Sequence, residues 1–124
     1  MSHPAPAAPI LVIDDDEDIR ATMLALFRAK GLSGIETAVD GVDGMHRIKS
    51  YQTPHIILVD LMMPNMNGWD LLKEVKADPA IASFHKFAVM SASRPLVSEL
   101  SEYPFFSKPL DFPKLFEFFS LAKM

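Results

Sequence analysis

The chain has 124 residues, which is the size of one compact domain. Its composition, 49% hydrophobic and 23% charged, is that of an ordinary globular protein, and a net charge of −4 without a basic block argues against direct binding to DNA or to an anionic membrane. Because cysteine is absent, disulfides, thiolate metal sites and cysteine nucleophiles are excluded.

The N-terminal residues 1–9, MSHPAPAAP, lack the basic start and the long apolar run of a signal peptide. No apolar run in the chain approaches the roughly 20 residues that a membrane helix needs. We therefore expect residues 1–9 to form a flexible arm, residues 10–124 to form the single domain, and the protein to be cytoplasmic without membrane insertion.

The first half of the domain alternates short apolar runs with helical patterns. Ile10–Ile13 is apolar on both faces, which suits a buried strand of a parallel sheet. A helix follows, with apolar residues at positions i, i+4, i+7 and i+8, and it stops at Gly31: Ile19, Met23, Leu26 and Phe27. Gly34–Ala38 is a weaker strand, and the next helix has one apolar stripe: Val42, Met45 and Ile48.

The second half continues the alternation. His55–Val59 is the strongest strand of the sequence, and the helix Trp69–Lys76 follows it. Phe87–Met90 and Tyr103–Phe106 are the last two predicted strands. The final helix has an aromatic face: Phe112, Leu115, Phe116 and Phe119. Strands that alternate with helices predict βαβ units, a parallel sheet and right-handed crossovers.

The connection between the last two strands is short. Only Ala92–Glu102 remain for it, near the minimum of roughly 10–12 residues for a crossover. A helix over Pro95–Glu102 would have about two turns. We therefore expect this fourth crossover helix to be short, irregular or missing.

Polar side chains follow four of the predicted strands. Three aspartates, residues 14–16, come after the first strand, Asp60 after the third, Ser91 after the fourth and Lys108 after the fifth. The carboxyl ends of parallel strands lie at one edge of a sheet, where ligands bind. Residues spread over most of the sequence should therefore meet in one cleft.

The residue types in this cleft point to phosphoryl chemistry. Neighbouring aspartates repel each other unless a cation is near or their pKa values rise. A Mg²⁺ ion held by one or two carboxylates, a backbone carbonyl and waters would leave positions open for phosphoryl oxygens. Asp60 would then serve as a nucleophile that forms an acyl phosphate. Lys108 would supply a charge, and Ser91 a hydrogen bond, to the phosphoryl oxygens.

Four segments of the chain, in this order, resemble the receiver domains of response regulators in two-component signal transduction. They are ILVIDDDE (10–17), DLMMPNMNG (60–68), MSA (90–92) and SKPL (107–110). The resemblance extends from residue 10 to about residue 122. It implies a flavodoxin-like, doubly wound α/β fold with a five-stranded parallel sheet in the order 2-1-3-4-5, here as a stand-alone receiver.

The resemblance also implies the phosphoacceptor and the metal ligands. Asp60 would accept the phosphoryl group, and Asp15 would be the direct ligand of Mg²⁺, for which Mn²⁺ can substitute. Asp14 would act mostly through water, and the main-chain carbonyl of Met62 would complete the protein ligands. Asp16 lies where the family accepts many residues, so we expect it to face solvent or to act as a more distant charge.

Two further positions follow from the resemblance. Ser91 and Lys108 would bind the phosphoryl group, and Ser91 would also take part in switching together with Phe105, which occupies the family's switching aromatic position. Because Phe105 lacks the hydroxyl of the tyrosine often found there, we expect it to stay inward in both states and to switch weakly.

The implied function is that of a phosphoacceptor, not of an enzyme with ordinary turnover. The phosphoryl group would come from a histidine kinase or a histidine phosphotransfer protein, and the chain would catalyse only its own phosphorylation and dephosphorylation. It would signal by changing shape toward an unidentified downstream protein, or serve as a phosphate sink, and we expect a monomer. The alternative is an interaction module that has kept the fold but does not depend on phosphorylation.

Other interpretations of the acidic run fit less well. Asp14, Asp16 and Asp18 imitate the start of a calcium loop, but Ile19 replaces its glycine and Ala25 its final glutamate. The same aspartates resemble the motif of haloacid dehalogenase phosphohydrolases, but Asp18 stands where threonine or valine is required and the chain is short for that fold. A solvated turn or helix cap is the remaining alternative for these residues.

The histidines do not form a predicted site. His46, His55 and His85 belong to separate elements and have no ligand spacing. We expect each of them to lie at the surface or to cap a strand.

Overall fold

The computed structural model describes residues 9–32, 34–63, 65–92 and 102–121. The strands are β1 (Ile10–Ile13), β2 (Ile35–Ala38), β3 (Ile56–Asp60), β4 (Lys86–Ser91) and β5 (Phe105–Ser107). The helices are α1 (Glu17–Ala29), α2 (Gly41–Ser50), α3 (Gly68–Lys76), α4 (Pro79–Phe84) and α5 (Phe112–Leu121).

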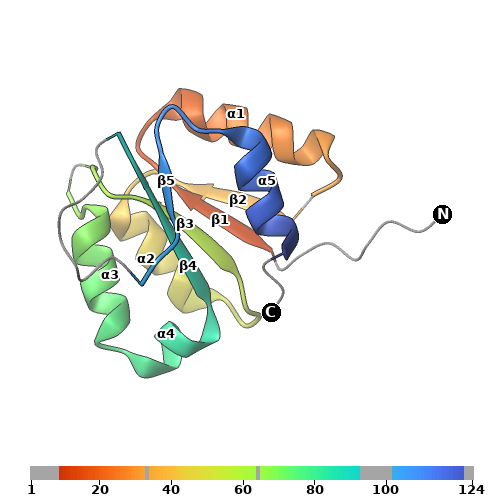
Figure 1. The fold of residues 1–124 in the computed structure, drawn as a ribbon. Coiled ribbons are helices and arrows are strands. Elements are labelled where there is room, and N and C mark those ends of the chain that lie inside the picture. Colours follow the sequence, from red (N-terminus) through yellow and green to blue (C-terminus); the bar gives the residue numbers. More distant parts are fainter. Residues whose placement is uncertain (1–8, 33, 64, 93–101, 122–124) are drawn as a thin grey trace.

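The strands form one parallel sheet in the order β2-β1-β3-β4-β5, which confirms the predicted fold class. Helices α1 and α5 cover one face of this sheet, and α2 and α3 cover the other (Figure 1). The central strands are buried on both sides because helices pack against both faces, which explains why their sequences are continuously apolar.

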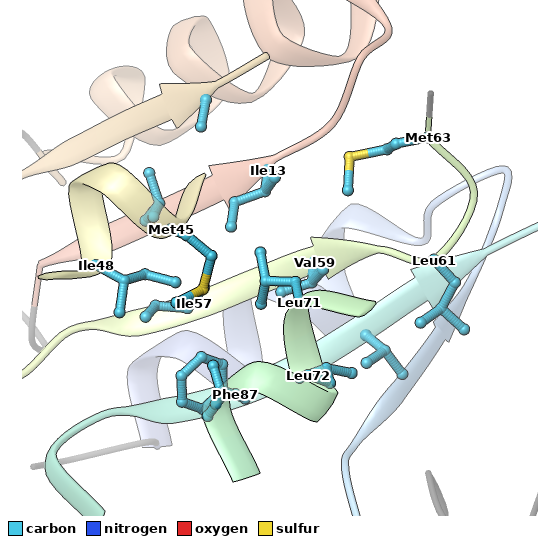
Figure 2. Close-up of a cluster of buried hydrophobic side chains, with 14 residues drawn as sticks. Ile13, Met45, Ile48, Ile57, Val59, Leu61, Met63, Leu71, Leu72 and Phe87 are labelled. Atoms are coloured by element: carbon cyan, nitrogen blue, oxygen red, sulfur yellow. The ribbon is translucent and has the colours of Figure 1, made fainter. Parts of the chain in front are cut away.

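Alternate residues of each strand enter two separate hydrophobic clusters. In β1, Leu11 and Ile13 belong to the cluster beneath α2 and α3, whereas Ile10 and Val12 belong to the cluster beneath α1 and α5. Figure 2 shows Ile13 of the first cluster beside Met45 of α2. This alternation is the period of two that a strand imposes on its side chains, and it fixes the register of the sheet.

Two predicted features differ in the structure. The buried face of α2 consists of Gly41, Gly44, Met45 and Ile48, and Val42 is 49% exposed, so its place in the predicted stripe was wrong. A β-carbon at Gly44 would lie 2.6 Å from the Cδ1 atom of Ile13. The absence of a side chain at Gly44 therefore lets this face of α2 approach the sheet, which turns Val42 outward.

The fifth strand begins two residues later than predicted, at Phe105 and not at Tyr103. Pro104 has no N–H with which to join the ladder, although its carbonyl accepts a hydrogen bond from the N–H of Val89 at 2.9 Å. The sequence analysis also missed α4, which begins with Pro79 after the capping residue Asp78 and has no buried residue. A helix without a buried stripe leaves no periodic signal.

Two predictions fall mainly outside the described residues. The short or missing crossover helix lies within residues 92–102, of which 93–101 are not described. The N-terminal arm is not described before Pro9, whose carbonyl accepts a hydrogen bond from the N–H of Ile56 at 2.9 Å. Within the described ranges, none of the helices has the length and hydropathy required to cross a bilayer.

Candidate functional site

The predicted site residues meet at the carboxyl edge of the sheet. Asp14 directly follows β1, Asp60 and Ser91 end β3 and β4, and Lys108 directly follows β5. The register pairs Ile13 with Val59 on β1 and β3, so Asp14 and Asp60, the next residues along the chain, lie side by side at this edge. Residues separated by 94 positions in the sequence are thus in direct contact.

Lys108 links the two buried carboxylates. Its Nζ atom donates hydrogen bonds to Oδ2 of Asp14 at 2.8 Å and to Oδ2 of Asp60 at 3.0 Å. The main-chain N–H of Lys108 donates to the carbonyl of Ser91 at 3.0 Å, which ties the end of β5 to the end of β4. These contacts hold the ammonium group between the two aspartates. The Lys108–Pro109 peptide bond is cis.

Further hydrogen bonds fix Asp14 at the end of β1. Its main-chain N–H donates to the carbonyl of Ala38 at 3.1 Å, and its Oδ1 accepts from the N–H of Asp16 at 2.9 Å. Asp16 in turn caps α1, because its carboxylate accepts hydrogen bonds from the N–H groups of Asp18 and Ile19. Asp16 is exposed, as expected, and its contact in the structure is this helix cap.

Three carboxylates form a group suited to a hard cation. Asp14, Asp15 and Asp60 each present an oxygen atom, and these atoms lie within 4.8 Å of one another. Asp14 and Asp60 are buried, whereas Asp15 is exposed. A set of oxygen donors with one side open to solvent matches the preference of Mg²⁺, which binds few carboxylates and keeps several waters. The residues present therefore fit the predicted ion.

The Met62 main chain lies next to the same site. Its N–H donates a hydrogen bond to Oδ1 of Asp60 at 3.2 Å. The side chain of Met62 is 69% exposed and does not contribute to the core. The role of its carbonyl as a metal ligand stays a prediction.

Burial and repulsion dominate the electrostatics of the site. Burial, together with the negative charge of Asp14, raises the pKa of Asp60 to about 6, against the opposing effect of the Met62 N–H and of Lys108. Burial acts to lower the pKa of Lys108, but its hydrogen bonds and attraction to Asp14 and Asp60 outweigh this and leave the pKa raised. The ammonium stays charged, and the negative charge around it is only partly offset.

The two remaining predicted residues differ in their surroundings. Ser91 is buried at the end of β4, at the edge where the aspartates lie. Phe105 is half-buried in β5 and packs against the hydrophobic cluster beneath α2 and α3. Its predicted weak switching stays a prediction.

Sequence reasoning missed two residues beside the site. Arg20 donates a hydrogen bond from Nη1 to the main-chain carbonyl of Asp14 at 2.9 Å. Gly68 begins α3, and a β-carbon there would lie 2.4 Å from the carbonyl oxygen of Asp60. Two signals in the sequence could have indicated these residues. Arg20 is a single cation after five consecutive acidic residues, and Gly68 is a glycine immediately before a predicted helix.

The histidines form no part of this site. His55 and His85 precede β3 and β4 and are buried at the amino edge of the sheet, where they cap the strands. Nδ1 of His85 accepts a hydrogen bond from the main-chain N–H of His55 at 2.9 Å, and the Tyr51 ring stacks on His55 with 3.6 Å between centroids. Burial and the neighbouring His55 lower the pKa of His85. His46 is exposed on α2.

Comparison with known proteins agrees with this arrangement. Residues 10–119 match the family model of the response regulator receiver domain. The chain is 35% identical over 83 residues to Protein PilG of Pseudomonas aeruginosa, covering 67% of the chain and 60% of that protein. It is 33% identical over 101 residues to a gliding motility regulatory protein of Myxococcus xanthus, covering 77% of the chain but 13% of that longer protein.

Solved structures share the fold. A response regulator receiver protein from Pseudomonas putida has a TM-score of 0.78 at 21% sequence identity. The match covers 96% of this chain and 100% of that protein. The chemotaxis protein CheY4 of Vibrio cholerae has a TM-score of 0.76 at 21% identity, with 92% and 97% covered. At these identities the likeness concerns the fold alone.

Proposed function

Because the chain belongs to the response regulator receiver domain family, we propose that it accepts a phosphoryl group on Asp60 from a histidine kinase or a histidine phosphotransfer protein. Receiver domains of two-component systems take phosphoryl groups from histidine kinases. The observation that carries the proposal is the position of Asp60, a buried carboxylate at the end of β3 in contact with Lys108 and beside Asp14.

The transfer needs a nucleophile and a means to stabilise negative charge. A carboxylate oxygen of Asp60 attacks phosphorus, and the bond from phosphorus to the donor's imidazole nitrogen breaks, with its electron pair leaving on that nitrogen. Lys108 neutralises charge on the phosphoryl oxygens, and the Ser91 hydroxyl donates a hydrogen bond to one of them. The reaction is thus governed mainly by positioning and electrostatics.

The carboxylates of Asp14, Asp15 and Asp60 and the carbonyl of Met62 would hold Mg²⁺ or Mn²⁺. Asp15 would bind directly, and Asp14 mostly through water. When bound, the ion would offset the negative charge shared by the carboxylates and the incoming phosphoryl oxygens. The carboxylate oxygens of Asp14, Asp15 and Asp60 that lie within 4.8 Å of one another support the carboxylate part of this assignment.

The surface beside Lys108 offers room for a phosphodonor protein. A hollow of about 280 Å³ lies between α1 and the start of α5, with apolar walls that include Ile19, Leu110 and Phe112. Lys108 lines the same hollow. A donor that rests its apolar side chains there would bring its phosphoryl group to the edge that carries Asp60.

Incubation with acetyl phosphate and Mg²⁺ tests the proposal. The intact mass should rise by one phosphoryl group, and Asp60→Asn should abolish the gain because the nucleophile is lost. Asp70→Asn, which changes an exposed aspartate in the first turn of α3, is the matched control and should be phosphorylated normally. A wild-type chain that gains no mass would contradict the proposal and favour an interaction module that does not depend on phosphorylation.

A further inference from the structure

Arg20 is a cation beside the site that the proposed chemistry does not use. It lies on α1 and is partly buried, and its guanidinium Nη1 atom donates a hydrogen bond to the main-chain carbonyl of Asp14 at 2.9 Å. No ion pair of Arg20 is found among the residues that the structure describes. A charged donor has therefore been placed on a neutral carbonyl although five acidic residues, 14–18, lie close by in sequence.

This hydrogen bond fixes the peptide group from which Asp15 departs. The carbonyl of Asp14 and the N–H of Asp15 belong to one planar peptide unit, so a contact that holds the carbonyl also holds the plane. The other contacts of Asp14 act on its N–H, through Ala38, and on its carboxylate, through Asp16 and Lys108. Among the described contacts of Asp14, the hydrogen bond from Arg20 is the one that holds its main-chain carbonyl, and therefore the peptide group shared with Asp15.

The placement of the charge also differs from that of Lys108. Lys108 binds carboxylate oxygens of Asp14 and Asp60 directly, so it competes with any cation for those atoms. Arg20 binds a carbonyl oxygen and leaves the carboxylate oxygens of Asp14 and Asp15 available as ligands. Its positive charge reduces the repulsion within the acidic turn without occupying a ligand position.

We propose that Arg20 is a positioning residue for the metal site: it holds the Asp14–Asp15 peptide so that both carboxylates are presented together to a divalent ion. The inference rests on the proposed function only in taking this ion to be Mg²⁺. Groups that orient metal ligands from outside typically contribute about 10–100-fold to metal affinity, so the affinity for Mg²⁺ is the quantity to measure.

The test is a titration of the full chain with Mg²⁺, followed by ¹H–¹⁵N NMR. Arg20→Met keeps much of the aliphatic stem but removes the charge and the donors, and it should weaken Mg²⁺ binding about tenfold. Arg20→Lys keeps a charge and a donor and should recover most of the affinity. Arg28→Met removes the same charge from an exposed position of α1 and should bind Mg²⁺ as the wild type does.

Two readouts separate a positioning role from a merely structural one. Urea unfolding without Mg²⁺ reports the stability of each variant, and the Asp16 amide resonance reports the turn through its hydrogen bond to Asp14. Loss of Mg²⁺ affinity in Arg20→Met, with recovery in Arg20→Lys, supports the proposal. An unchanged affinity in Arg20→Met, or an equal loss in Arg28→Met, overturns it, as does a wild-type chain that binds no Mg²⁺.

The outcome is independent of phosphorylation. If the wild type binds Mg²⁺ but gains no phosphoryl group, the proposed function fails, and the ratio of the Mg²⁺ affinities still decides the role of Arg20. If the wild type is phosphorylated and Arg20→Met binds Mg²⁺ normally, the proposed function stands and the role of Arg20 is refuted.

Discussion

At the scale of single residues, the charge of the site is incompletely balanced. Lys108 is the one ammonium that contacts Asp14 and Asp60 among the described residues, and Asp15 adds a third carboxylate nearby. The pKa of Asp60 is raised to about 6 mainly because of burial, and the negative charge of Asp14 raises it further. The contact with Lys108 lowers the pKa but does not outweigh these two effects. This residual negative charge is the electrostatic reason for the site to attract a cation.

His85 makes stability depend on pH at the opposite edge of the sheet. Burial and His55 lower its pKa from 6.5, so the folded chain binds this proton less readily than the unfolded chain does. The stability that depends on neutral His85 is fully present above about pH 6.5, the pKa in the unfolded chain. It is lost as the pH falls through the lower pKa that His85 has in the folded chain. Urea unfolding between pH 5 and pH 8 should show this loss.

His85→Asn is the matched variant, because its amide oxygen can accept the hydrogen bond from the His55 N–H but does not titrate. The fall in stability toward low pH should be smaller in this variant than in the wild type. Asp60 acts in the opposite sense, since its raised pKa favours the folded state as the pH falls through about 6. The wild type and His85→Asn share the effect of Asp60. If their unfolding free energies changed equally with pH, the role of His85 would be contradicted.

At the scale of elements, continuous apolar runs predicted the central strands correctly, whereas elements without a clear apolar pattern were missed or misplaced. The runs Ile10–Ile13 and His55–Val59 coincide with β1 and β3 to within a residue at each end, because burial on both faces requires continuous apolar sequence. By contrast, α4 packs no buried residue, and the outward turn of Val42 depends on the close approach of Gly44 to Ile13. Tertiary contacts of this kind have no local pattern.

The junction between β3 and α3 depends on a missing side chain. A β-carbon at Gly68 would lie 2.4 Å from the carbonyl oxygen of Asp60 and 2.8 Å from Cα of Leu61, and backbone atoms cannot move aside cheaply. Gly68→Ala should therefore cost about 1–3 kcal/mol of unfolding free energy and slow phosphorylation from acetyl phosphate by displacing Asp60.

Gly34→Ala provides the control, because a β-carbon at Gly34 meets Pro9 at an ordinary 3.7 Å. This variant should keep nearly the wild-type stability and phosphorylation rate. If Gly68→Ala behaves like Gly34→Ala in urea unfolding, the backbone at the end of β3 is less constrained than the structure indicates.

At the scale of the whole molecule, the location of the site could be predicted because topology determines it. Parallel strands place their carboxyl ends at one edge, so Asp14, Asp60, Ser91 and Lys108 were expected to meet there before any contact was known. The contact of Arg20 could not be predicted, since it depends on how α1 leaves the sheet. The apolar periodicity of a sequence predicts that a helix is present, but it does not predict the direction of the helix relative to the sheet.

Binding of Mg²⁺ should stabilise the entire domain, because an ion that binds only the folded state shifts the unfolding equilibrium. At a concentration tenfold above its dissociation constant the gain is roughly 1.4 kcal/mol, measurable as a higher thermal midpoint. Asp15→Asn should lose this gain but keep the stability of the wild type without Mg²⁺, since Asp15 is exposed. An equal gain in both chains would show that the ion binds elsewhere.

The contact between Asp14 and Lys108 joins the residue that follows the first strand to the residue that follows the last strand, across 94 positions. Closing so long a loop requires nearly the whole chain to be in place, so an incompletely synthesised or partly folded chain lacks the contacts of Lys108 with Asp14 and Asp60. The proposed phosphorylation of Asp60 would therefore require the finished domain, and a truncated chain that lacks β5 should not be phosphorylated.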